Sequence, residues 1–275
     1  MVRGWFFLSM VLMCQATAAT VTQCNQLLEQ ALDDRNPDTR MQAVAAMSLA
    51  ALKAPVFARL EGMLKDKDVQ VREAAVASLA EVKTSRARAA LRRALDDDTP
   101  EVSFAAARAL WALRDPAGER ALLAVLEGEE KTSSNFFSKQ KREALRMMHT
   151  PKVLFLYAVR QGIGFAPVPG LGEGIASMEA LLTDPGVSGR ATAALLLGRD
   201  RSQSALDALE DALLDKDWLV RAAAVHSLAL RNDPALRKDM EPMLEDKKEA
   251  VRLRAAAGYL RLSAIQARRK SNRKN

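Results

Sequence analysis

One arrangement of apolar and polar positions recurs along the chain. An apolar segment ends at an Asp, a short polar turn follows, and a Val-Arg pair then opens a run of alanines. The arrangement is clearest at residues 66–75, 215–224 and 246–255. In the second segment of the first of these, Val71, Ala75 and Leu79 recur at the spacing of one helix face. The arginines Arg190, Arg221 and Arg252 stand 31 residues apart. A fixed period of this length predicts helix pairs stacked into a solenoid.

The turn between the two helices of each unit has its own residue pattern. An Asp stands six residues before each arginine position, and four residues before it stands Asn36, Asp68, Thr99, Gly186 or Asp217, with Lys248 as the exception. These five are good N-cap residues. Pro37 and Pro100 follow their caps at the first helical position, where a missing N–H costs nothing. Each unit is therefore expected to be a first helix, a tight turn and a capped second helix.

The Asp-to-Arg spacing and the Val-Arg-x-Ala-Ala segment resemble the HEAT-repeat family, in particular the bacterial HEAT-like repeats first associated with phycobilisome lyases. The resemblance covers about residues 22 to 265 and implies a hydrogen-bonded ladder between neighbouring repeats. Its expected members are Asp34, Asp66, Asp97, Asp184, Asp215, Asp246, Arg40, Arg72, Arg190, Arg221 and Arg252. Ser103 replaces the arginine of the third unit, so an interruption of the ladder is expected there.

The predicted fold is all-α, a right-handed α-solenoid of about seven stacked antiparallel helix pairs over residues 20–266. Regular repeats are expected at 22–115 and 176–265, with an irregular repeat and a Gly/Pro-rich insertion at 116–175. The insertion, 151–174, is interpreted either as a structural plug over an irregular joint or as a binding element. The two regular halves could then act as separate platforms joined by this centre. Since a solenoid keeps distant repeats apart, Cys24 is expected far from both histidines.

The N-terminus has the layout of a secretory signal peptide. Arg3 precedes an apolar run at residues 5–13, and Ala16, Thr17 and Ala18 supply small residues at a cleavage site. Residues 1–18 are predicted to be removed, with the cut after Ala18 or Ala19, and the mature chain to lie in the bacterial periplasm. An uncleaved anchor or a buried first helix is the alternative.

The excess positive charge of the chain lies mainly at its C-terminal end. Lys and Arg number 41 against 34 Asp and Glu, a formal net charge of +7, and much of that excess lies in the last residues. Residues 267–275 are predicted to form a basic disordered tail, with solubilisation or a weak contact with an anionic membrane surface as its roles. The folded body is close to neutral, which argues against nucleic-acid binding.

Residues suited to catalysis or metal binding are scarce. The chain has 2 His and 2 Cys, and neither His149 nor His226 has a second ligand at metal-binding spacing or forms a His-Glu pair. No Gly-x-Ser-x-Gly motif occurs. The sequence therefore predicts a protein that is not an enzyme and has no cofactor and no metal.

The third unit carries a candidate partner-binding patch. Phe104, Arg108 and Trp111 share one face of the second helix. The inward face of that helix is predicted to hold Val102, Ala106 and Leu110. Another unit has small or polar residues at the patch positions, Ala222, His226 and Ala229. Aromatic residues with Arg are typical of interface hot spots, although Phe104 and Trp111 could instead pack beneath the insertion.

The predicted function is that of a non-catalytic protein–protein interaction scaffold or adaptor of the bacterial envelope, which binds an unidentified protein on the concave face of the solenoid. One alternative is a lyase-like HEAT protein or enzyme subunit. The other is a peripheral membrane protein that uses the 151–174 insertion and the basic tail.

Overall fold

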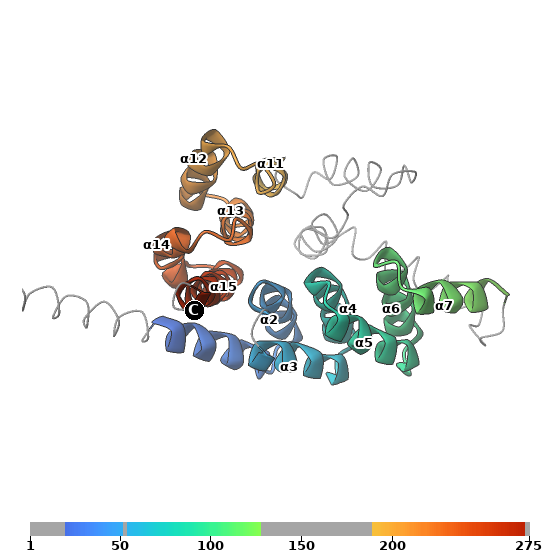
Figure 1. Cartoon of the computed structure of the whole chain (residues 1–275). Helices are drawn as coiled ribbons and strands as arrows, with labels where there is room; N and C mark the ends of the chain where they lie inside the picture. The colour runs from blue at the N-terminus through green and yellow to red at the C-terminus, as the bar shows by residue number, and fades with distance from the viewer. Residues whose placement is uncertain (1–19, 52–53, 128–188, 273–275) are drawn as a thin grey trace, which may run out of the picture.

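The computed structural model describes residues 20–51, 54–127 and 189–272, and the regular structure in these ranges is helical (Figure 1). The predicted signal peptide, the 151–174 insertion, His149, Asp184 and Gly186 lie outside the described residues. The prediction of an all-α solenoid is confirmed.

The helices form two layers along a curved stack, with the second helix of each unit on the inner side (Figure 1). The inner layer consists of α2 (Pro37–Ala50), α4 (Val69–Val82), α6 (Pro100–Ala112), α11 (Gly189–Leu197), α13 (Trp218–Leu230) and α15 (Glu249–Asn272). The outer layer consists of a helix over 20–32, α3 (Ala54–Gly62) with η1 (Met63–Lys65), α5 (Ser85–Arg93) with η2 (Ala94–Asp96), α12 (Gln203–Asp211) with η3 (Ala212–Leu214), and η4 (Pro234–Leu236) with α14 (Arg237–Met240) and η5 (Pro242–Glu245). α7 (Pro116–Glu127) packs on α6 at one end of the stack.

Capping side chains start three inner helices where the turn pattern predicted them. The side chains of Asn36, Asp68 and Asp217 accept hydrogen bonds from the backbone N–H groups of α2, α4 and α13. Thr99 is also the N-cap of α6, but its side chain does not cap the helix. Its hydroxyl instead accepts a hydrogen bond of 2.6 Å from Nη2 of Arg72 in the preceding repeat.

Small side chains allow the helices to approach closely. Residues 222–229 of α13 are all buried, so this inner helix is covered on every side. At the other end of the stack, a Cβ added to Gly118 of α7 would lie 2.3 Å from the backbone N of Trp111. Only glycine therefore permits the approach of α7 to α6.

The order of the repeats in space differs from their order in sequence, because the last repeat packs directly on the first. Figure 1 shows the inner layer running α11, α13, α15, α2, α4, α6. Glu249 at the start of α15 accepts a hydrogen bond from Thr39 at the start of α2, and Arg261 further along α15 donates to the backbone O of Leu49 near the end of α2. α15 and α2 therefore run parallel, like successive inner helices within a half.

This junction corrects two expectations from the sequence. The first and last repeats are not kept apart, and the halves do not depend on the centre of the chain alone for their connection. Gln23, next to the buried Cys24 in the sequence, donates to Glu245 of the last repeat at 3.4 Å. The repeat pattern could not predict this contact, because an exposed face of one repeat can pack on any matching face, whichever repeat supplies it.

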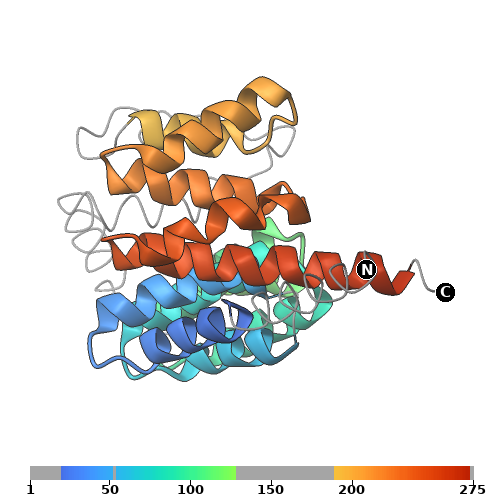
Figure 2. The ribbon, with the colours of Figure 1, turned by 90° about the vertical axis from the view of Figure 1, so that its left-hand side faces the viewer.

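The basic end of the chain also differs from its prediction. α15 continues as an exposed helix through 267–272, past the stacked helices, as Figure 2 shows. The expected disorder after residue 266 was therefore wrong for these six residues. Arg and Lys have high helix propensity and suit the negative end of the helix dipole, so the packed part of α15 can propagate into them. None of the helices in the described ranges is long and apolar enough to cross a membrane.

Candidate functional site

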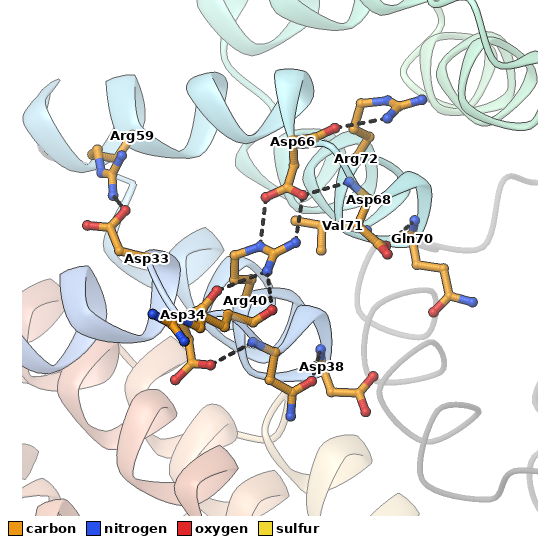
Figure 3. A network of polar contacts seen from close by, with 12 residues as sticks. Asp33, Asp34, Asp38, Arg40, Arg59, Asp66, Asp68, Gln70, Val71 and Arg72 are labelled. Carbon is orange, nitrogen blue, oxygen red and sulfur yellow. Dashed lines mark hydrogen bonds and ion pairs between the residues drawn. The ribbon is translucent and has the colours of Figure 1, made fainter.

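The predicted Asp and Arg positions meet between repeats in a repeated contact. Nε and Nη2 of Arg40 donate to the two carboxylate oxygens of Asp66 in the next repeat, at 2.8 and 2.9 Å (Figure 3). Nη1 of Arg40 donates to the backbone O of Asp34 in its own turn at 2.9 Å. Asp66 in turn accepts from the backbone N of Asp68 at 2.8 Å. One arginine thus ties its own turn to the turn of the following repeat.

The same contact recurs along both halves. The pairs are Arg72 with Asp97, Arg190 with Asp215, and Arg221 with Asp246. Burial alone would raise the pKa of Asp66, but its hydrogen bonds from Arg40 and from the Asp68 amide outweigh that effect and lower the pKa. Asp246 has a lowered pKa for the same reasons, with Arg221 as its partner. These carboxylates are engaged in joining repeats, which leaves them unsuited to acid–base chemistry.

The Arg–Asp ladder ends at the last repeat, and a serine replaces its arginine in the third unit. Arg252, in the last repeat, donates to the backbone O of Asp246 and lies 4.0 Å from Glu249. Ser103 bonds weakly within its own turn, to the backbone O of Pro100 at 3.4 Å.

A different ion pair lies nearby. Arg92 of α5 donates to Asp115, whose pKa is lowered chiefly by that hydrogen bond. The repeat pattern does not predict this pair, although an Asp directly before Pro116 is a signal for a helix start.

The candidate partner-binding patch lies on α6 as its spacing predicted. The inward residues Val102, Ala106 and Leu110 are fully buried. On the other side of α6, Phe104 is half-buried, Arg108 is exposed, and Trp111 is 43% exposed. An exposed tryptophan beside an arginine is suited to the centre of a protein interface. Whether the insertion covers Phe104 and Trp111 concerns residues outside the described ranges.

A second cluster, which the sequence pattern does not predict, lies where the last repeat meets the first. A cavity of about 150 Å³ is lined there by residues of α2, α4, α13 and α15, among them His226 and Arg261. His226 is 3% exposed, and its Nε2 has no hydrogen-bond partner. Burial lowers the pKa of His226 to about 3, with smaller contributions from Arg254 and Arg261. His226 occupies the same position in its repeat as Arg108 of the α6 patch, but the neighbouring first repeat buries it.

This cluster could be found only from the structure, because Glu81 and Arg261 come from repeats that are far apart in sequence. The part of the chain with described coordinates contains no group of three or more His, Cys, Asp or Glu side chains that could hold a metal ion. The arrangement of the junction is suited to binding, since it combines a cavity with positive charge and an unpartnered ring nitrogen.

Solved structures similar to this chain are helical proteins of low sequence identity. Human deoxyhypusine hydroxylase in complex with glycerol is 17% identical, with 90% of this chain and 99% of that chain covered and a TM-score of 0.32. The complex of CpcE and CpcF of phycocyanin lyase from Nostoc sp. PCC7120 is 15% identical, with 89% and 94% covered and a TM-score of 0.32. A designed armadillo repeat protein is 18% identical, with 86% and 98% covered and a TM-score of 0.26. Among curated protein sequences, none matches.

The family comparison gives a direct result. The model described as HEAT repeats matches residues 25–111, 56–132 and 176–261, which together make up more than half of the chain. The matched segments contain the Arg–Asp contacts and the helix pairs described above. This chain belongs to the HEAT-repeat family.

Proposed function

We propose that this protein is a non-catalytic scaffold or adaptor of the bacterial envelope that binds a partner protein on the inner face of its solenoid. The α6 patch carries the proposal. Trp111 is 43% exposed, whereas the neighbouring inward positions of the same helix are fully buried. Trp and Arg are enriched among the residues that dominate binding energy at protein interfaces, so the combination of Trp111 with Arg108 on one exposed face supports partner binding there.

The chemistry of the rest of the chain supports binding over catalysis. The ladder aspartates Asp66, Asp97 and Asp246 are held by arginines of the preceding repeats. A rigid, curved row of helices presents side chains over a wide surface, and a few anchors then supply most of the affinity. The predicted signal peptide at residues 1–18 is the reason for placing the protein in the periplasm.

Site-specific photo-crosslinking tests the proposal. A photoreactive phenylalanine analogue at position 111 is expected to yield one dominant crosslinked protein in cells of the host. The matched control is the same analogue at position 214, since Leu214 is an apolar side chain that is 83% exposed and lies in η3 of the outer layer. Identical products at both positions, or none at position 111, would count against the inner face as the binding surface.

A further inference from the structure

The cavity at the junction of the last and first repeats has walls from both ends of the chain. His226 comes from α13 and Arg261 from α15, while Ser48 comes from α2 and Glu81 from α4. Neither half could form this cavity alone. The site therefore exists only where the helices α13, α15, α2 and α4 are stacked together.

His226 is the first sign that the cavity takes a ligand. His226 lines the cavity and only 3% of it is exposed to solvent, yet its Nε2 makes no hydrogen bond. Leaving a buried polar atom without a partner costs about 1–3 kcal/mol. The cost is removed when a group with a matching oxygen occupies the cavity.

Two arginines provide the second sign. Arg254 is 2% exposed, and its one hydrogen bond runs from Nη1 to the backbone O of Ala250 in its own helix. Arg261 uses Nε for Asn232 and Nη1 for the backbone O of Leu49, and neither partner carries a charge. Both guanidinium groups retain N–H donors beyond these bonds.

Burial disfavours the charged form of both arginines. Burial lowers the pKa of Arg254 to about 10, with Glu81 acting weakly in the opposite direction, and burial also lowers the pKa of Arg261. Among the described residues that line the cavity, Glu81 is the sole carboxylate. Arg261 lines the cavity and is partly exposed, whereas the buried Arg254 does not line it but lies close enough to lower the pKa of His226. A buried positive charge with only a backbone hydrogen bond, as at Arg254, is costly in a protein interior.

The size of the cavity limits the ligand. A volume of about 150 Å³ is close to that of cavities that hold a benzene-sized molecule. A ligand of roughly four to eight non-hydrogen atoms fits this space, whereas a tetrapyrrole or a peptide segment is too large.

We propose that the junction cavity is a binding site for a free small carboxylate. Arg261 donates to the carboxylate oxygens and neutral His226 donates from Nε2. Arg254, about two turns before Arg261 on α15 and outside the cavity lining, supplies a second positive charge nearby. The site is independent of the α6 patch, and its occupation links the two ends of the chain.

Thermal unfolding of the full chain with sodium succinate, sodium acetate or sodium phosphate tests this proposal, against sodium chloride at equal ionic strength. A carboxylate at several times its Kd is expected to raise the Tm by about 2 °C or more. Calorimetric titration with succinate gives the Kd directly. Arg261→Lys retains the charge but loses the planar fork, and is expected to weaken succinate binding about tenfold.

Two variants separate this site from a general salt effect. His226→Leu removes the unpartnered nitrogen and is expected to fold at pH 7 but to lose the response to succinate. Ser78→Ala removes another buried unpartnered atom, outside the cavity, and is expected to retain the response. The proposal is overturned if wild-type protein responds to no carboxylate, if phosphate alone raises the Tm, or if His226→Leu still responds.

Discussion

The contacts between repeats within a half and the contact between the two halves use arginine in opposite ways. Within a half, Arg40 meets the carboxylate of Asp66 and both side chains are at least 90% buried. At the junction, Arg254 is equally buried but bonds only to a backbone oxygen of its own helix. The repeat unit therefore carries its own charge compensation, whereas the junction places arginines of the last repeat where the repeat pattern supplies no aspartate.

The largest expected effect comes from breaking a ladder pair. Arg40→Met leaves Asp66 buried without its partner, and the expected loss of unfolding free energy is about 3–5 kcal/mol. Arg59→Met is the control, because Arg59 pairs with Glu29 and Asp33 at the surface, where all three side chains are at least 40% exposed. That control is expected to lose about 1 kcal/mol or less. Urea unfolding at pH 7 measures both, and equal losses would contradict the role of the ladder.

The next largest expected effect is a loss of unfolding free energy on acidification, caused by His226. Its pKa is 6.5 when unfolded and about 3 when folded, facing Arg254, Arg261 and Glu81. Between these values the unfolded chain binds one more proton, so stability falls as the pH falls, by about 1.4 kcal/mol per pH unit.

Comparison of pH 6.5 with pH 5 isolates this contribution, since it should amount to about 2 kcal/mol. Asp66 and Asp246 have lowered pKa values, so their contribution is present above about pH 4 and is lost at lower pH. His226→Leu is therefore expected to flatten the stability between pH 6.5 and 5. An unchanged slope in this variant would show that another group is responsible.

A smaller effect on the unfolding free energy is expected when the same substitution is made at the junction, at Arg254 in place of Arg40. Arg254→Met removes a buried charge that has no ion pair, so the unfolding free energy is expected to change by less than about 1 kcal/mol or to rise. The comparison with Arg40→Met is made under the same conditions, without added carboxylate. A loss as large as that of Arg40→Met would show that Arg254 is compensated as fully as a ladder arginine.

Trp111→Ala is likewise expected to have only a small effect on stability. Because 43% of this side chain is already exposed, the expected loss is about 1 kcal/mol, a fall in Tm of about 2–4 °C or less. The crosslinked partner, in contrast, should disappear from cells. A fall of many degrees with the partner retained would show that Trp111 is a packing residue.

The sequence was sufficient to predict those structural features whose cause lies within one repeat or between consecutive repeats. The helix starts at Asn36 and Asp68 and the pairing of Arg40 with Asp66 follow from local spacing. The contact of α15 with α2 could not be predicted, since it depends on how the curvature of every repeat adds up. The burial of His226 depends on that contact, and the cavity beside it was missed for the same reason.

The contact between α15 and α2 is the central claim, and crosslinking within one chain tests it most directly. Thr39 and Glu249 are replaced by Cys and the native Cys14 and Cys24 by Ala. The dilute protein is then treated with a short bis-maleimide. The account predicts an intramolecular link between positions 39 and 249, because their side chains are in hydrogen-bonding contact at 3.2 Å. In a linear stack of about seven pairs, at about 10 Å per pair, these positions would be roughly 60 Å apart. Links that form only between molecules, or not at all, would contradict the account.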